Sequence, residues 1–333
     1  MAGAAAVGRM LSGERWLDAP NRLEEHRPMQ RERFIGAACV IAAAALWSLG
    51  GVGIKTAQTN PFAIAGFRSF FALFVLVAVL LWRMQREGFQ ASDTLRRRYV
   101  WWGAAGYALT MVSFTWANKL TTAANAILLQ YTAPIFVALL ARPLLNEPIT
   151  RRDRWAIGGC LFGMAWFFFG KLSWAGMAGN LLAIVAGIGF AAIALCLRAD
   201  ARTQPPAGGS PPSSLVLIAL GNALAAVLCA PAMLAALPLP SSTLGLLAGL
   251  GVLQIGVAYV FFAMGVSRVS ALESTLLAML EPILNPVWVA LATGERPAAT
   301  AVLGGAMVIG VIIWRQLERP AAAQAEASAN RSA

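Results

Sequence analysis

Charged residues are scarce in this chain of 333 residues. Only 12% of them are Asp, Glu, Lys or Arg, whereas 59% are hydrophobic and the mean hydropathy is +0.66. Soluble domains carry about 25% charged residues, so a soluble protein of this size could not cover its surface with so few charges. The composition therefore excludes a soluble globular protein and indicates an integral membrane protein.

Residues that commonly bind metals or carry catalysis are also few. The single histidine, His26, lies in the N-terminal segment, which excludes a histidine-rich metal site or His-dependent catalysis within the membrane. No GxxxxGK[ST] loop for ATP and no paired acids are visible, so we expect no enzyme activity, no metal and no cofactor. The cysteines have no CxxC spacing, and we interpret them as small buried apolar residues: Cys39, Cys160, Cys196 and Cys229.

Long apolar segments are what the chain has instead. Each is about 20 residues long, the length that crosses a ~30 Å hydrocarbon core as a helix. The segments are 34–54, 62–83, 100–118, 121–141, 153–170, 176–197, 214–236, 243–266, 269–292 and 299–316. We therefore predict an all-α membrane protein with ten transmembrane helices. Residues 1–33 lack the apolar core of a signal peptide and are expected to form a tail.

The positive charges are distributed unevenly between the two sides of these ten helices. With the N-terminus inside, 21 Lys and Arg residues fall on the cytoplasmic side and 4 on the outside. Such a bias places both termini in the cytoplasm. The net charge of +11 is thus mainly a topology signal, and we expect a lipid bilayer rather than a nucleic acid as partner. A monomer in the inner membrane is compatible with the sequence.

The chain repeats itself. Residues 128–147 read LLQYTAPIFVALLARPLLNE, residues 276–295 read LLAMLEPILNPVWVALATGE, and a shift of 148 residues aligns Pro134 with Pro282 and Glu147 with Glu295. Each half, 34–170 and 176–316, holds five predicted helices, with 171–175 between them and a tail at 317–333. Because five is odd, the halves would have opposite orientations, as in transporters that work by alternating access.

Several segments resemble the EamA-type drug/metabolite transporter superfamily, and most closely its bacterial aromatic amino-acid exporter (YddG-type) branch. They are AALWSLGGVGIK, AGFRSFFALFVL, QYTAPIFVALLARPLLNEPIT and LEPILNPVWVALATGERP, in this order along the chain. The resemblance implies a ten-helix inner-membrane carrier with both termini inside and a central substrate cavity between the halves. It also implies that the fifth and tenth helices pack toward one side.

Two charged residues fall inside predicted helices. Glu281 lies near the bilayer centre, where an acid is costly and commonly functional. It could carry a coupling proton, or it could fix helix packing beside Pro282, which is the interpretation we favour. Arg68 lies six or seven residues from the outer end of its helix and could snorkel outward, bind a substrate carboxylate or pair with Glu281. Glu147 and Glu295 are interpreted as solvated turn residues.

Pro134 and Pro282 interrupt two apolar segments at aligned positions. A proline donates no hydrogen bond to the carbonyl four residues earlier, so these two release the carbonyls of Gln130 and Ala278. Irregular backbone at this depth is expected to line a cavity or meet a side chain. We interpret both prolines as hinges, although prolines are also tolerated passively in membrane helices.

Polar and aromatic residues near the middle of the predicted helices are the candidates for a substrate cavity: Trp47, Ser48, Tyr107, Gln130, Tyr131, Gln254 and Tyr259. Each alone could serve a helix–helix hydrogen bond. Together they predict an apolar pocket with a few donors and acceptors. The sequence thus favours a secondary transporter that exports neutral, in particular aromatic, amino acids or similar small metabolites. The alternative is a multidrug exporter of lipophilic cations.

Overall fold

The computed structural model describes residues 18–87, 91–121, 123–170, 176–202, 212–284, 287 and 298–317. All regular elements in these ranges are helices, which confirms the all-α class. Five helical stretches are long and apolar enough to cross a membrane: Pro61–Arg86, Asn125–Leu145, Met177–Arg202, Ser214–Ala235 and Ser241–Val266. A shorter apolar helix spans Ala299–Arg315. The chain is therefore a multi-pass helical membrane protein.

The helices follow the predicted order, but some predicted segments are interrupted. Continuous helices are α4 (Pro61–Glu87), α6 (Arg98–Leu120), α9 (Arg151–Phe167), α10 (Met177–Arg202), α11 (Pro212–Ala235) and α16 (Ala299–Leu317). Interrupted segments form α2 (Asp18–Trp47) with α3 (Gly50–Thr56), α7 (Ala123–Gln130) with α8 (Ala133–Leu145), and α12 (Ser241–Gly249) with the π-helix η1 (Leu250–Val257) and α13 (Ala258–Val266). α14 (Ala271–Ala278) begins the segment whose later part, 285–286 and 288–292, lies outside the described residues.

The first predicted segment, 34–54, is helical, but its helix is broken between Trp47 and Gly50. Gln254 causes the break, because its side-chain Nε2 donates to the carbonyl oxygen of Trp47 at 3.3 Å. A Cβ atom at Gly50 would lie 2.6 Å from the amide carbon of Gln254, so only glycine fits beside it. A side chain inserted in this way is a recognised cause of a helix break.

Two further breaks occur next to the aligned prolines. α7 ends at Gln130 and α8 begins just before Pro134, while α14 ends at Ala278, four residues before Pro282. The carbonyl oxygen of Gln130 lies against α10, where a Cβ atom at Gly187 would come within 2.7 Å of it. The helices are thus interrupted at the two places where the sequence predicts that a proline leaves a carbonyl oxygen without its helical hydrogen bond.

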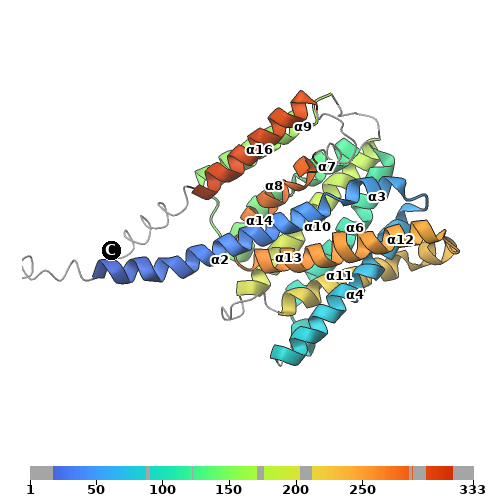
Figure 1. Ribbon diagram of the computed structural model, residues 1–333, viewed down its shortest axis with the longest axis horizontal. Helices are drawn as coiled ribbons and strands as arrows, with labels where there is room; N and C mark the ends of the chain where they lie inside the picture. The colour runs from blue at the N-terminus through green and yellow to red at the C-terminus, as the bar shows by residue number, and fades with distance from the viewer. Residues whose placement is uncertain are drawn as a thin grey trace, which may run out of the picture.

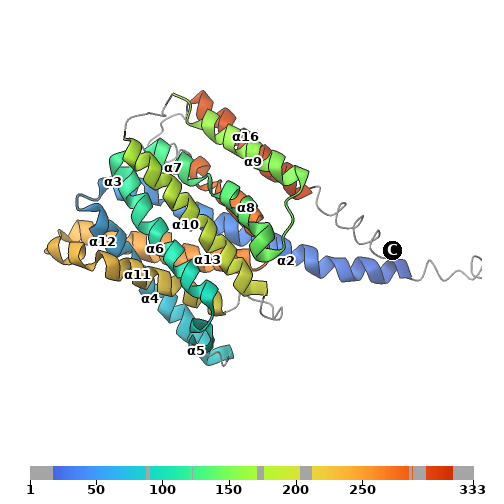
Figure 2. The same cartoon turned by 180° about the vertical axis from the view of Figure 1, so that it is seen from behind.

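The helices pack as a bundle with one pair set to the side. α9 and α16 lie side by side along their length, apart from the remaining helices, as expected from the resemblance (Figure 1). Seen from behind, α4, α11, α6 and α10 run next to one another (Figure 2). Facing glycines allow close approach: a Cβ atom at Gly304 of α16 would lie 2.5 Å from the carbonyl oxygen of Gly163 of α9. Small residues at such contacts are typical of membrane helix pairs.

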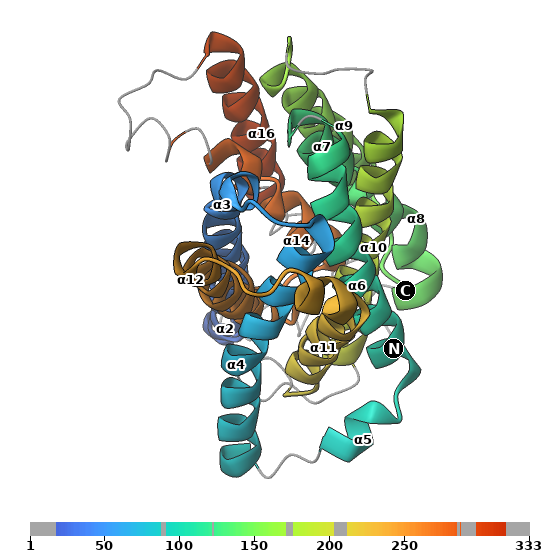
Figure 3. The same ribbon diagram turned by 90° about the vertical axis from the view of Figure 1, so that its right-hand side faces the viewer.

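The two ends of the bundle differ in chemistry. α14 begins and α16 ends at one end, which we name the charged end because the ion pairs described below gather there. The opposite end, which we name the far end, carries α3 and the beginning of α12 and faces the viewer in Figure 3. Residues 18–33, which were predicted to belong to the N-terminal tail, form the first part of α2, and this part extends beyond the charged end (Figure 1).

Candidate functional site

A partly open cavity lies within the bundle. Its lining comprises Trp47, Arg68, Thr110, Met111, Phe114, Gln130, Phe190, Gln254, Ile255, Tyr259 and Glu281. The structure therefore brings together four of the predicted cavity residues and both predicted intramembrane charges. They come from α2, α4, α7, η1, α13 and the helical residues 281–284 that follow the turn after α14. The lining combines apolar side chains with a few convergent polar groups, as small-molecule sites do. The cavity has a volume of about 30 Å³, which holds a water molecule or two, so it has to widen before it can hold an amino acid.

Three of the predicted cavity residues lie behind the lining instead. The Ser48 hydroxyl donates to the carbonyl oxygen of Ala45 at 2.6 Å. The Tyr107 hydroxyl donates to Oδ1 of Asn222 at 3.1 Å, and its ring packs at 4.7 Å from that of Tyr259. Tyr131 contacts Glu281 from outside the cavity. These residues position the lining rather than form it.

Arg68 points into the protein and not toward the outer interface, so the snorkelling interpretation was wrong. The residue is 3% exposed, and its Nη2 donates to Oε1 of Gln254 at 2.6 Å. Gln254 lies in η1, and short π-helical segments often occur at functional sites because they displace side chains from their usual register. The π-helix thus places an amide oxygen next to a buried guanidinium.

Three polar atoms of the lining have no hydrogen-bond partner among the described residues. They are Nε of Arg68, Nε1 of Trp47 and Oε1 of Gln130, and all three are buried. Buried polar groups are nearly always hydrogen-bonded, so each unsatisfied one needs an explanation. Two donors and one acceptor on the same cavity would be satisfied by ordered water or by a polar ligand that displaces it.

Glu281 lies at the break that follows α14. Oε2 of Glu281 lies 2.6 Å from the hydroxyl of Tyr131, and the same hydroxyl donates to the carbonyl oxygen of Ala278 at 2.8 Å. Ala278 is the residue whose carbonyl Pro282 releases. A side chain from the first half of the chain therefore satisfies the irregular backbone of the second half.

An aromatic cluster adjoins the polar lining. Ring centroids of Trp47 lie 5.0 Å from Tyr259, 5.1 Å from Phe262 and 5.8 Å from Phe190. Phe190 and Phe262 are stacked at 5.6 Å. Offset and edge-to-face aromatic pairs in this distance range are favourable beyond the apolar area that they bury. The cluster gives the cavity a rigid aromatic wall.

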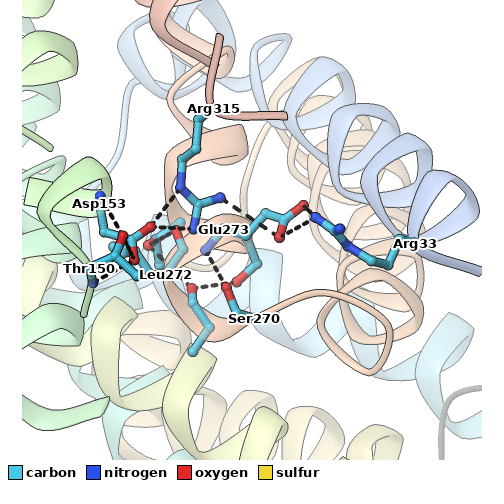
Figure 4. Close-up of polar contacts among 10 residues, drawn as sticks. Arg33, Thr150, Asp153, Ser270, Leu272, Glu273 and Arg315 are labelled. Atoms are coloured by element: carbon cyan, nitrogen blue, oxygen red, sulfur yellow. Dashed lines mark hydrogen bonds and ion pairs between the residues drawn. The ribbon is translucent and has the colours of Figure 1, made fainter. Parts of the chain in front are cut away.

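A buried ion-pair network lies at the charged end of the bundle (Figure 4). Arg315 of α16 lies between two carboxylates, with Nη2 at 2.9 Å from Asp153 of α9 and Nη1 at 3.7 Å from Glu273 of α14. Arg33 of α2 approaches the same Glu273 at 3.4 Å. The side chains of Arg315, Asp153 and Glu273 are only 4%, 3% and 1% exposed. The network thus ties the lateral α9–α16 pair to the main bundle.

Other ion pairs lie at the same end. Arg97 of α6 pairs with Asp200 of α10 at 3.3 Å, and Arg198 of α10 pairs with Glu147 at 2.8 Å. Glu147 was predicted to be a solvated turn residue, and this was wrong because its side chain is 17% exposed and ion-paired. The corresponding prediction for Glu295 lies outside the described residues.

The sequence interpretation missed this network, although a signal for two of its members was present. Thr150 and Asp153 form a capping box at the start of α9, and the Ser270 side chain accepts from the backbone of Glu273 at the start of α14. The pattern [ST]-x-x-[DE] before an apolar run marks such a helix start. It predicts the cap, but not that each carboxylate also meets Arg315.

The cysteines fit their sequence interpretation. Cys39, Cys160 and Cys229 are buried, and Cys196 is partly buried. No group of three or more His, Cys, Asp or Glu residues that could hold a metal ion occurs in the described parts of the chain.

Comparisons with known proteins agree with this architecture. The model of the EamA-like transporter family matches residues 34–169 and again residues 177–314. An uncharacterized transporter of Archaeoglobus fulgidus is 27% identical over 286 residues, which cover 84% of this chain and 97% of that protein. A solved crystal structure superposes with a TM-score of 0.67 at 20% identity, covering 84% of this chain and 96% of the other. Members of this family are transporters rather than enzymes, and the chain belongs to the EamA-like transporter family.

Proposed function

We propose that this membrane transporter is a secondary carrier that exports neutral amino acids, in particular aromatic ones, or similar small metabolites across the inner membrane. The observation that carries the proposal is the set of unsatisfied polar atoms around the cavity. Nε of Arg68 and Nε1 of Trp47 are donors suited to a carboxylate, whereas Oε1 of Gln130 is an acceptor suited to an ammonium group. Glu281 offers a carboxyl group on the same cavity.

The apolar part of the cavity supports an aromatic side chain on the substrate. Phe190, Tyr259 and Trp47 line the cavity and belong to the aromatic cluster. An aromatic ring placed against them would gain offset or edge-to-face contacts. Met111 adds adaptable apolar surface, and Ile255 adds a stiffer apolar side chain.

The charges of the cavity favour a zwitterion over the alternative substrate, a lipophilic cation. Arg68 is buried in the lining, and no ion pair of the described residues joins it to a carboxylate, although Glu281 lines the same cavity and acts on it electrostatically. A cavity that holds one guanidinium and one carboxyl group offers an opposite charge to each end of a zwitterion. A cation would gain only from Glu281 and would be repelled by Arg68.

The distribution of charge supports an orientation with the charged end in the cytoplasm. α2 enters the bundle at the charged end, so Arg31 and Arg33 of this helix lie on that side. Both termini are then cytoplasmic, as the positive-inside bias requires. In this orientation the ion pairs hold the cytoplasmic end closed, and they would separate when that end opens.

The pattern of helix contacts supports ten helices in two inverted repeats. α4 packs on α11 and α9 packs on α16, so the second and fifth helices of one half pair with their counterparts in the other. α6, the third helix of the first half, packs on α10, the first helix of the second half. In the same way α2, the first helix of the first half, packs on α13, which belongs to the third helix of the second half. Each of these contacts is thus repeated with the two halves exchanged, as expected for inverted repeats.

Alternating access would use the breaks at Pro134 and Pro282 as hinges. Replacing either proline by Ala should straighten its helix and bias the carrier toward one access state. Transport should then slow more than binding weakens, because each cycle visits both states. Spin labels across the two mouths of the cavity report the bias as shifted distances. Unchanged distances and transport in both variants would contradict the hinge.

Uptake into liposomes that contain the purified protein tests the function. The panel consists of labelled neutral, acidic and basic amino acids, nucleosides and cationic dyes. We expect saturable, protein-dependent uptake of aromatic and large aliphatic amino acids, with little uptake of dyes. Transport of the dyes without the amino acids would favour the multidrug alternative.

A further inference from the structure

The hydroxyl group of Tyr131 faces two oxygen atoms but carries one hydrogen. It lies 2.8 Å from the carbonyl oxygen of Ala278 and 2.6 Å from Oε2 of Glu281. Tyr131 is 2% exposed, so these bonds are made inside the protein. A phenol donates one hydrogen bond and accepts others, so only one of the two oxygens can receive its hydrogen.

The protonation of Glu281 decides which oxygen that is. The Ala278 carbonyl can only accept, and Pro282 supplies no N–H to it. If Tyr131 donates to Ala278, the short contact to Glu281 requires a hydrogen on the carboxyl group, which then donates to Tyr131. If Glu281 is ionised, its carboxylate accepts the hydrogen bond of the Tyr131 hydroxyl, and the Ala278 carbonyl loses this donor. A buried carbonyl left without a donor costs about 1–3 kcal/mol, so both bonds are complete only with a protonated Glu281.

The surroundings of Glu281 leave room for a positive group. The charged and titratable side chains that share the cavity with it are Arg68 of α4 and Tyr259 of α13. Arg68 bonds to Gln254, and no ion pair of the described residues joins Arg68 to Glu281. The helices α2, α6 and α10 contribute only uncharged side chains to the lining. Arg68 therefore acts on Glu281 only at longer range, and an ammonium group in the cavity could form the direct ion pair that Arg68 does not form.

We propose that Glu281 is a proton-binding site that exchanges its proton for the ammonium group of the substrate, with Tyr131 as its positioning residue. When the ammonium group arrives, the carboxylic acid releases its proton to cavity water and the carboxylate pairs with the ammonium. The hydrogen of Tyr131 then turns from Ala278 to Glu281, which removes a donor from the break after α14. Substrate binding would thereby loosen the backbone at Pro282. The proposal rests on the amino-acid carrier function stated above.

Infrared spectroscopy of the full-length protein in lipid tests the proton without any ligand. We expect the C=O stretch of a protonated carboxyl group at neutral pH, absent in Glu281→Gln and changed in frequency in Tyr131→Phe. Glu147→Gln is the matched control, because this carboxylate pairs with Arg198 at 2.8 Å and should contribute no such band. A spectrum without a Glu281 band, or a band indifferent to Tyr131→Phe, would overturn the proton site.

The exchange is tested by proton release in the same preparation, with a pH-sensitive dye and saturating L-phenylalanine or phenethylamine. We expect protons to be released in step with binding by the wild type and not by Glu281→Gln. Phenethylamine has an ammonium group but no carboxylate, so it probes Glu281 independently of amino-acid recognition. Binding of either ligand without proton release overturns the exchange. If neither ligand binds, the proposed function fails, and the infrared band alone then decides the proton site.

Discussion

Replacing Arg68 by Gln should abolish transport of neutral amino acids. Among the described residues, Arg68 is the only basic one that lines the cavity, and its Nε has no hydrogen-bond partner there. Without it, a substrate carboxylate would be buried with no opposite charge. Losing one partner of such a buried, charge-assisted contact costs about 2–5 kcal/mol, which corresponds to a fall in affinity of roughly 30-fold to several thousand-fold. Binding of labelled amino acid to the purified variant measures this fall.

The same substitution elsewhere on α4 provides the control. Arg86 is exposed near the end of α4 and packs over Trp82 at 5.2 Å, so Arg86→Gln should bind substrate as the wild type does. Thermal unfolding in detergent shows whether each variant is folded. A folded Arg68→Gln protein with unchanged affinity, or an equal loss in Arg86→Gln, would contradict the role of Arg68.

Replacing Arg315 by Met should cause the largest loss of stability. The substitution keeps most of the apolar stem but leaves Asp153, whose side chain is 3% exposed, without its cation. Removing one partner of a buried ion pair costs about 3–5 kcal/mol, because the other charge stays buried. We expect a clear fall in the midpoint of thermal unfolding in detergent and weaker attachment of the α9–α16 pair.

Neutralising the remaining charge should restore part of this stability. The double variant Arg315→Met with Asp153→Asn removes both charges of the pair and should be more stable than Arg315→Met alone. Glu32→Gln is the control for an exposed pair, since the Glu32 side chain is 50% exposed, and it should change the free energy of unfolding by less than about 1 kcal/mol. Equal effects of Arg315→Met and Glu32→Gln would show that the network does not stabilise the charged end.

Much of the fold could be predicted because its signals are local. Apolar runs set the helices, and the prolines at positions 134 and 282 marked two of the breaks by residue type alone. The break at Trp47 could not be predicted, because its cause, Gln254, lies 207 residues away in the sequence. The sequence LGVLQIGV of η1 carries no proline, and its two glycines are common in ordinary transmembrane helices, so it does not reveal a π-helix.

The site was predicted less well, since the sequence gives the kind of residue but not its direction. Arg68 could equally have faced lipid headgroups. What fixes it inward is an amide 186 residues away. Asp153, Glu273 and Arg315 resemble ordinary interfacial charges, and only the tertiary packing of α9, α14 and α16 shows that they are buried together. Tyr131 was named as a candidate, but its link to Ala278 depends on the contact between the two halves.

The most direct test is the affinity of the purified protein for three ligands that share one aromatic ring: L-phenylalanine, phenethylamine and 3-phenylpropionate. They carry both charged groups, the ammonium alone and the carboxylate alone. A cavity with Arg68 and Glu281 arranged for a zwitterion predicts that L-phenylalanine binds at least about tenfold more tightly than either analogue, a difference of about 1.4 kcal/mol or more. Phenethylamine binding as tightly as L-phenylalanine would contradict recognition of the carboxylate and point to a carrier of cations.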